Sequence, residues 1–221
     1  AKGLKGLLQG VLSITESRER SYAKANAPFD GPFTAEGWVW LSGKVGNQHH
    51  LFGRRGGADM NFFAGRFRLW AGAGIGDLIE AKTATKPENW THVALTRDAS
   101  GALKVYMNGE LDAVGKKPLT EALGVLSIGD GNVPSGTIRY QEVRVWNRAR
   151  SAEEIRGSYL ANLSSAKPDG LTHRFGGETW PQTVGRAVLS WTRDYPELLT
   201  PEQTKALEEK FTRMKALVSL E

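Results

Sequence analysis

Residues 89–110 read NWTHVALTRDASGALKVYMNGE, two short apolar runs that are each followed by a turn signal. In the second run, Leu103, Val105 and Met107 alternate with other residues, as on a strand with one buried face. The pair Asn108-Gly109 then gives the strongest short hairpin signal, because both central residues of such a turn take positive φ. The stretch therefore predicts antiparallel β-strands joined by hairpins.

The same pattern of short strands and turns extends outward over most of the chain. Glycine, asparagine and aspartate interrupt apolar or alternating runs about every eight to twelve residues, which is the spacing of all-β sandwiches. The first strong helix signal is a capping box at Ser151-Ala-Glu-Glu154, after which Ile155 and Tyr159 fall on one helix face. The pattern predicts strands at Gly10–Thr15, Phe33–Leu41, His50–Arg54, Phe62–Trp70, His92–Asp98, Ala102–Met107, Val125–Ile128 and Gln141–Trp146.

Composition excludes several classes of function. The chain has 221 residues, no cysteine and four histidines, so it forms neither a disulfide scaffold nor a Cys-ligated metal site. Its net charge of +5 falls short of the clustered basic stripe of nucleic-acid-binding proteins. No apolar run approaches the roughly 18 residues of a membrane helix. We therefore expect no nucleic-acid partner and no membrane span.

The chain divides into two regions of different character. Residues 1–165 hold the predicted strands, and the polar stretch SSAKPDG at residues 164–170 is typical of a linker. An N-cap threonine, a first-turn proline and regularly spaced apolar residues predict an amphipathic helix over Thr200–Leu220. We expect a domain over residues 1–165 and a partly helical extension over residues 166–221. The apolar stripe of the helix either docks on the sandwich or binds a partner helix in a longer parent chain.

Five stretches, taken in order, resemble the strands of a known family. They are similar to laminin-G-like domains of the concanavalin A-like lectin/glucanase superfamily, and the likeness covers about residues 10–160. It implies an all-β, concanavalin A-like jelly-roll sandwich of two antiparallel sheets, and it does not extend to residues 166–221. The stretches are FTAEGWV at 33–39, NWTHVALTRD at 89–98, VYMNG at 105–109, LSIG at 126–129 and GTIRYQEVRVWNRARSAEEI at 136–155.

The resemblance raises the question of glycan hydrolysis. Glucanases of this fold carry Glu-x-Asp-x-(x)-Glu on one strand, where alternation directs the three carboxylates into a cleft. The nearest string here is Glu110-Leu-Asp112-Ala-Val-Gly115, which lacks the final glutamate. The sequence also has no serine-elbow motif that would form a catalytic triad. We therefore expect a domain without catalytic activity.

Calcium is the second property that the resemblance suggests. Relatives often bind it at one rim of the sandwich, through carboxylates and carbonyl groups of loops. By position, Asp130 and Asn132 are the first candidates, and Asp77 and Glu142 are weaker ones. The last strand of the family often begins with Asp-Glu-Val, whereas this chain has Gln141 in place of the aspartate. The expectation is therefore either no cofactor or a calcium ion.

Tryptophan side chains supply the remaining candidate site. Trp38 and Trp90 match tryptophans that are common in the family, so we expect them in the core. Trp40 and Trp70 are not explained in this way. With Arg66 and Arg68 they form the predicted ligand-binding set, because sugar rings stack on exposed indole faces. The alternative is that these indoles pack under a loop or against the C-terminal segment.

These observations lead to one expected function and two alternatives. The expectation is non-catalytic recognition of a carbohydrate or glycoconjugate, by one module of a larger bacterial protein that is exported or held in the cell envelope. The partners would then be a glycan or glycoprotein surface and other domains of the parent chain. The first alternative is a structural or protein-interaction domain without sugar binding. A glycan-cleaving enzyme with an unrecognised site is the second.

Overall fold

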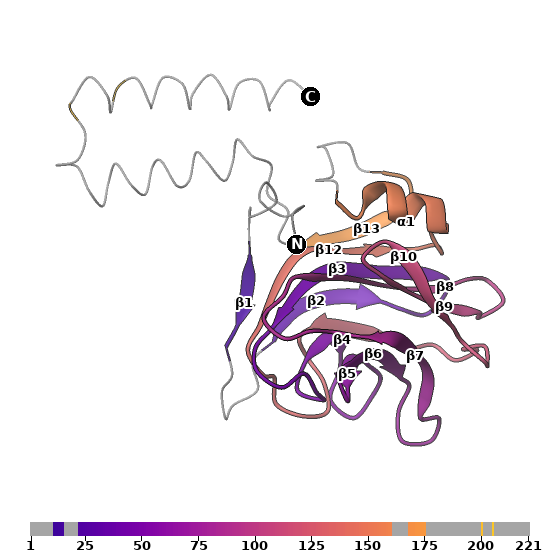
Figure 1. Ribbon diagram of the computed structural model, residues 1–221. Coiled ribbons are helices and arrows are strands. Elements are labelled where there is room, and N and C mark those ends of the chain that lie inside the picture. The colour runs from indigo at the N-terminus through magenta and orange to yellow at the C-terminus, as the bar shows by residue number, and fades with distance from the viewer. Residues whose placement is uncertain (1–10, 16–21, 161–167, 176–199, 201–204, 206–221) are drawn as a thin grey trace.

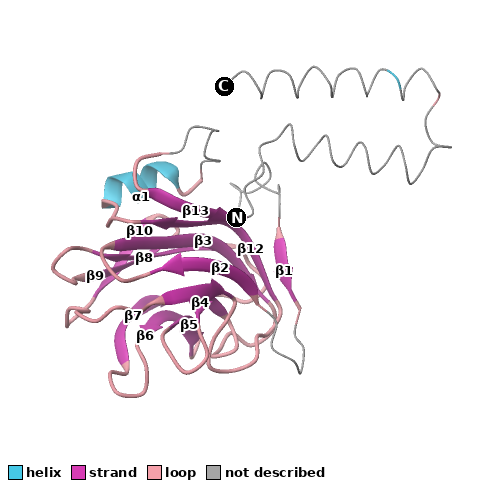
Figure 2. Cartoon of the chain, turned by 180° about the vertical axis from the view of Figure 1, so that it is seen from behind, coloured by secondary structure: helices cyan, strands magenta, loops and turns pink. Residues whose placement is uncertain are grey.

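The computed structural model describes residues 11–15, 22–160 and 168–175, together with Thr200 and Lys205. Its described part consists of strands packed in two layers, with one short helix on the outside (Figures 1 and 2). One layer, which we call the β3 sheet, has the strand order β1-β12-β3-β8-β9-β10, and β13 pairs with β12. Its strands are β1 (Leu12–Ile14), β3 (Phe33–Leu41), β8 (Thr91–Arg97), β9 (Leu103–Met107), β10 (Glu110–Val114), β12 (Ile138–Trp146) and β13 (Leu171–Phe175).

The second layer, which we call the β5 sheet, has the strand order β2-β11-β4-β5-β6-β7. All pairings between the described strands of both sheets are antiparallel. The predicted fold class, an all-β jelly-roll sandwich, is therefore confirmed. The strands of this sheet are β2 (Ala23–Pro28), β4 (His50–Gly53), β5 (Asp59–Phe63), β6 (Arg66–Trp70), β7 (Asp77–Ala84) and β11 (Val125–Ile128).

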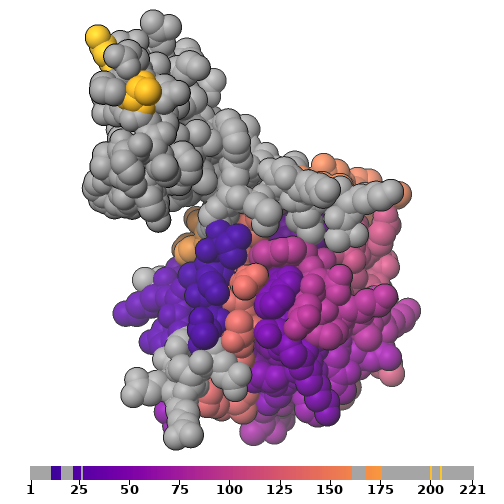
Figure 3. Space-filling model, turned by 60° about the vertical axis from the view of Figure 1, so that its left-hand side comes forward, coloured from indigo at the N-terminus to yellow at the C-terminus, as the bar shows by residue number. Residues whose placement is uncertain are grey.

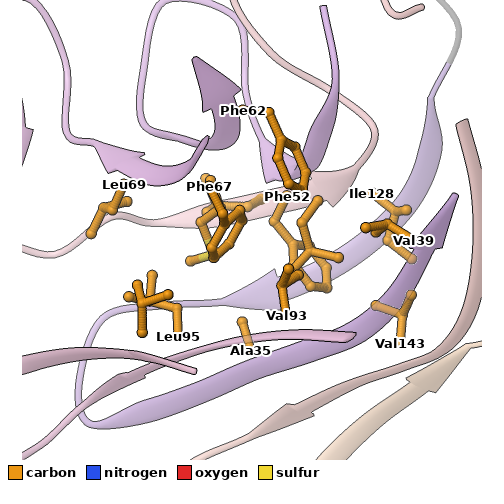
Figure 4. Close-up of a cluster of buried hydrophobic side chains, with 14 of the residues drawn as sticks. Ala35, Val39, Phe52, Phe62, Phe67, Leu69, Val93, Leu95, Ile128 and Val143 are labelled. Atoms are coloured by element: carbon orange, nitrogen blue, oxygen red, sulfur yellow. The ribbon is translucent and has the colours of Figure 1, made fainter. Parts of the chain in front are cut away.

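The hydrophobic core lies between the two sheets (Figure 4). Alternate residues of each strand point inward, so that aromatic rings of the β5 sheet meet aliphatic side chains of the β3 sheet. Each fully buried side chain of this size contributes about 1.5–3 kcal/mol by leaving water. The rings include Phe52, Phe62 and Phe67, and the aliphatic side chains include Val39, Val93, Leu95 and Val143.

The stretch that predicted the fold class forms the expected hairpins. In the turn between β9 and β10, Asn108 has φ of 51° and Gly109 has φ of 83°, as a type I′ turn requires. In the loop before β9, the Asp98 carboxylate accepts hydrogen bonds from the backbone N–H groups of Ser100 and Ala102. Gly101 closes this loop with φ of 85°. Both turns follow from side chains that favour these conformations.

One predicted strand is wrong. Residues 62–70 are not continuous but form a hairpin of β5 and β6, with a tight turn at Ala64 and Gly65. Both turn residues have positive φ, of 47° and 83°. Alanine seldom adopts this conformation, so the turn carried no recognisable signal. The strands β2, β7 and β13 were also not predicted, and β10 (Glu110–Val114) was implied only as the second arm of the Asn108-Gly109 hairpin, without bounds.

The helix α1 (Ala152–Ser158) covers part of the outer face of the β3 sheet (Figure 2). Its predicted capping box is present, since the Ser151 hydroxyl accepts from the Glu154 N–H and the Glu154 carboxylate accepts from the Ser151 N–H. Ile155 is fully buried and packs against Ala94 and Tyr106. The helix therefore shields the polar side chains of this face from water.

The ends of the described domain meet on one strand. The strand β1 pairs with the first half of β12, and β13 pairs with the second half of β12; both pairings are antiparallel. Figure 3 shows β1 beside β12. Residues 171–175, which the sequence assigns to the extension, are thus paired with the sandwich. The predicted helix over Thr200–Leu220 lies outside the described residues except for Thr200 and Lys205. No helix in the described ranges is long and apolar enough to cross a membrane.

Candidate functional site

The structure brings together three of the four residues predicted to bind a ligand. On β6, Phe67 and Leu69 point into the core, so Arg66, Arg68 and Trp70 lie on the outer face of the β5 sheet. Trp40 lies elsewhere, on the outer face of the β3 sheet. There its half-buried indole packs against the guanidinium of its β12 neighbour, Arg139, 4.4 Å from the ring centroid.

Arg68 is the centre of this group. It is only 8% exposed, and each nitrogen of its guanidinium donates a hydrogen bond. Nε donates to Asn61 Oδ1 at 2.9 Å, Nη1 donates to both oxygens of the Asp77 carboxylate at 2.7 and 2.9 Å, and Nη2 donates to Asn47 Oδ1 at 3.3 Å. The guanidinium also stacks on the Phe63 ring, 4.3 Å from its centroid. The side chain is therefore fixed in one orientation.

Around Arg68 the surface combines aromatic faces with polar groups. Phe63 is 47% exposed, Trp70 is half-buried and the Asp77 side chain is half-exposed. A flat aromatic ring beside fixed amide and carboxylate groups can hold the apolar face of a ring-shaped polar ligand and accept its hydrogen bonds. We call this the Arg68 surface; it consists of Asn47, Phe63, Arg66, Arg68, Trp70 and Asp77, with the fully buried Asn61 supporting Arg68 from below.

Sequence reasoning missed part of this surface. Asn61 and Phe63 reach it because β5 pairs with β6 in a register that places Asn61 opposite Arg68 and Phe63 opposite Arg66. This register was hidden, because residues 62–70 were predicted as one strand. Asn47 comes from the loop before β4, where no pattern in the sequence indicates a site.

A second feature is a pocket of about 470 Å³ at the strand ends where β7 and β9 end and β8 begins, which we call the aromatic pocket. Its floor is Trp38, which is 4% exposed, and the half-buried rings of Trp90 and Tyr159 pack against that indole. Trp38 is thus buried as predicted, but outside the core between the sheets, and Trp90, which was also predicted in the core, is only half-buried. The pocket is lined by Trp38, Thr83, Ala84, Lys86, Asn89, Trp90, Thr91, Met107, Asn108, Tyr159 and Leu160.

The carboxylates nearest to a glucanase motif have structural partners. The Asp112 carboxylate accepts hydrogen bonds from the backbone N–H groups of Lys82 and Thr83 and from the Thr83 hydroxyl. Glu110 forms an ion pair of 3.1 Å with Arg156 of α1. These two acids connect β10 to β7 and to the helix, and the arrangement gives no support to a hydrolytic role.

Comparison with known families identifies the fold. The model of the concanavalin A-like lectin/glucanases superfamily matches residues 18–156. This chain belongs to that superfamily. A search of curated proteins finds no match.

Solved structures of the superfamily fold resemble the chain at low sequence identity. A proposed carbohydrate-binding protein from Bacteroides ovatus is 19% identical, with a TM-score of 0.53 over 77% of this chain and 52% of that one. Domain 4 of AbnA, an extracellular GH43 arabinanase from Geobacillus stearothermophilus, in complex with arabinotriose, is 19% identical, with a TM-score of 0.50 over 68% and 87%. A heptameric SAP-like pentraxin from Limulus polyphemus is 12% identical, with a TM-score of 0.52 over 77% and 89%. This member of the superfamily therefore spans about half the length of the Bacteroides protein.

The four residues predicted for calcium in this superfamily member lie at three separate places. Asp130 and Asn132 are in the loop after β11, whereas Asp77 is bonded to Arg68 on the β5 sheet. Glu142 is buried in β12, where its carboxylate accepts from Arg144 and Arg174. Among the described residues, no three His, Cys, Asp or Glu side chains converge so that they could hold a metal ion.

The loop that contains Asp130 and Asn132 instead packs on an unusual carboxylate, that of Asp59 at the start of β5. Asp59 is 2% exposed, and its Oδ2 accepts from the backbone N–H of Asn132 at 3.2 Å and from Asn132 Nδ2 at 2.8 Å. Burial raises the pKa of the Asp59 carboxyl to about 6, against the lowering effect of these bonds. The Asn132 Oδ1 atom already accepts from the Gly56 N–H at 2.8 Å. A calcium ion takes six to eight oxygen ligands. Because Asn132 Oδ1 is engaged by Gly56 and no group of three acidic side chains converges in the described residues, the residues present do not fit a calcium ion.

A buried charge network lies beneath α1. Glu36 accepts from Arg150 Nη1 at 2.8 Å and from the Trp146 indole at 3.0 Å, and Arg144 lies 3.5 Å away. Burial, with Arg144 and Arg150 nearby, lowers the pKa of His92 to about 3, so His92 is neutral at physiological pH. Such perturbed groups often mark functional sites. Here all five side chains are below 8% exposed, so the network is structural.

Proposed function

We propose that this domain is a non-catalytic carbohydrate-recognition module and that the Arg68 surface holds the sugar. One observation carries the proposal. An exposed ring, Phe63, and a half-buried indole, Trp70, flank a guanidinium whose hydrogen bonds hold the side chains of Asn47, Asn61 and Asp77 in place. A surface that is rigid before binding loses little side-chain entropy when it takes up a ligand.

The comparisons support this proposal at the level of fold. Two of the similar structures carry names that refer to carbohydrate, the Bacteroides protein and the arabinanase domain with arabinotriose. Because the chain spans about half of the Bacteroides protein, we propose that it works as one module of a longer protein. The Bacteroides protein and the Geobacillus arabinanase are bacterial, and the arabinanase is extracellular. We therefore also propose that the parent protein is bacterial and is exported or held in the cell envelope, where glycans are accessible.

The proposal is tested by screening the protein on a glycan array and measuring the affinity of the best ligand by calorimetry. We expect Trp70→Ala and Phe63→Ala each to weaken binding by about tenfold or more, because aromatic anchors dominate such interfaces. Trp40→Ala is the matched control, since this half-buried indole lies on the outer face of the other sheet. It should leave affinity unchanged.

Three results would count against the proposal. Absence of binding to every glycan, with and without calcium, would favour a structural or protein-interaction domain. If Trp40→Ala reduced glycan affinity as much as Trp70→Ala and Phe63→Ala do, the Arg68 surface would not be the binding site. Release of a shortened glycan product during incubation would indicate an enzyme.

A further inference from the structure

The aromatic pocket is separate from the Arg68 surface and is built from other elements. Its lining comes from β3, the end of β7, the β7–β8 loop, the start of β8, the end of β9, the turn between β9 and β10, and the two residues after α1. In Figure 1, α1 and the hairpin of β9 and β10 lie on the same side of the molecule. A volume of about 470 Å³ falls in the range of ligand pockets, about 300–1,000 Å³. The pocket is large enough for one pyranose ring.

The aromatic side chains of the pocket are held in place by the protein itself. The Trp38 indole N–H donates to the Tyr159 carbonyl at 2.9 Å, and the two rings stack with centroids 6.0 Å apart at 27°. The Tyr159 ring packs so tightly on the hairpin turn that a Cβ atom on Gly109 would lie 2.6 Å from it. Since the N–H of Trp38 is already satisfied, this residue offers the pocket only an apolar surface. The aromatic part is therefore preformed.

The rim of the pocket is polar and carries positive charge only. Among its described lining residues there is one cation, Lys86, and no acid. Lys86 is exposed and forms no ion pair with any residue in the described ranges. This unbalanced charge favours an anionic ligand.

Two asparagine amides at the rim are positioned for further hydrogen bonds. The Asn108 Oδ1 atom accepts from the His92 backbone N–H at 3.0 Å, and Asn89 Nδ2 donates to the Pro87 carbonyl at 2.8 Å. These bonds fix both exposed amides. They leave the Asn108 amide nitrogen and the Asn89 amide oxygen without a partner in the described structure, so the rim presents a donor group and an acceptor group.

We infer that the aromatic pocket binds a sugar residue that carries a carboxylate, that is, a hexuronic acid. The C–H face of the pyranose packs on Trp90, the carboxylate pairs with Lys86, and the ring hydroxyls bond to the two asparagine amides. Aromatic walls alone would fit any flat apolar group, but the amides and the single cation select a ligand with both hydroxyls and negative charge. This inference does not depend on the proposal for the Arg68 surface. The two sites have in common only that a carbohydrate is the proposed ligand of each.

The test compares methyl glycosides of glucuronic and galacturonic acid with those of glucose and galactose, titrated into the full chain and followed by calorimetry. At least one uronide should bind more tightly than its neutral counterpart. Lys86→Gln should reduce its affinity by about fivefold and abolish the preference, because an exposed ion pair contributes this much. Trp90→Ala should weaken binding by about tenfold or more, whereas Trp90→Phe, which keeps a stacking face, should retain most of it.

Trp70→Ala, on the Arg68 surface, is the control and should leave uronide affinity unchanged. The inference is overturned if neither uronide binds, if neutral and acidic glycosides bind equally, or if binding survives Trp90→Ala. Loss of uronide binding in Trp70→Ala alone would assign the acidic sugar to the Arg68 surface instead. The two proposals can therefore fail separately, since each has its own variant.

Discussion

At the scale of single residues, Asp59 shows how a polar side chain can oppose folding. Its Oδ2 atom accepts two hydrogen bonds from Asn132, but its Oδ1 atom is buried without a hydrogen-bond partner in the described structure. Burial raises the pKa of this carboxyl from 3.8 to about 6. The folded protein therefore binds the proton more tightly than the unfolded chain does. The contribution of Asp59 to the free energy of unfolding is complete below about pH 4 and is lost as the pH rises through 6.

Asp59→Asn should remove this pH dependence. The asparagine oxygen can still accept from Asn132, and no charge is then buried. The variant should gain stability relative to wild type between pH 4 and pH 7, by about 3 kcal/mol if the full pKa shift applies. Denaturant unfolding of both proteins at several pH values measures this difference. A difference that does not change with pH would contradict the assignment to Asp59.

At the scale of elements, the turn between β5 and β6 decides whether the Arg68 surface forms. It reverses the chain over Ala64 and Gly65, so that β6 returns beside β5 and places Arg68 opposite Asn61. The exposed alanine sits at φ of 47°, where its Cβ atom is disfavoured. This turn is therefore a point at which the hairpin can be strengthened without altering its surface.

Ala64→Asn should stabilise the protein by about 0.5–1 kcal/mol, because Asn-Gly is the preferred pair for a type I′ turn. Thermal unfolding measures the gain as a higher Tm. The matched control is Ala73→Asn, at an exposed loop alanine whose φ is not positive. If Ala64→Asn and Ala73→Asn raised Tm equally, the geometry of the turn would not be the cause of the gain in stability.

The sequence predicted those elements in which alternation and turn chemistry agree. The predicted bounds of β3 and β11 match the structure, because apolar residues and turn residues mark both strands clearly. The strand β2, with the sequence AKANAP, was missed because alanine, asparagine and proline are poor strand formers. For the site, the sequence analysis grouped Arg66, Arg68 and Trp70 with Trp40, and the alternation of β6 in the structure places the first three on one face. The sequence could not show that Trp40 lies in the other sheet, because a single strand carries no information about pairing.

At the scale of the whole molecule, Glu36 joins parts of the chain that are far apart in sequence. Its carboxylate accepts from Arg150, 114 residues later, and from the indole of Trp146 on β12. It therefore connects β3 to the last long strand and to the segment that leads into α1. Neither arginine of the network can reach water if this carboxylate is lost, since Arg144 and Arg150 are both buried.

Glu36→Gln should lower the free energy of unfolding by about 3–5 kcal/mol, because removing one partner leaves buried charge uncompensated. Denaturant titration measures the loss. Glu80→Gln is the matched control, at a half-exposed ion pair of 4.0 Å with Arg66, and should cost less than about 1 kcal/mol. If both variants lost a similarly small amount of unfolding free energy, the buried network would contribute little to stability.

The position of Asp112 has a consequence for the behaviour of the protein in concentrated solution. As the last strand of the β5 sheet, β7 would present a row of free N–H groups to which a strand of another molecule could add. The Asp112 carboxylate, reaching across from β10, already occupies the N–H groups of Lys82 and Thr83. Because the Asp112 carboxylate blocks two N–H groups of this edge, we expect it to hinder the addition of a strand from another molecule.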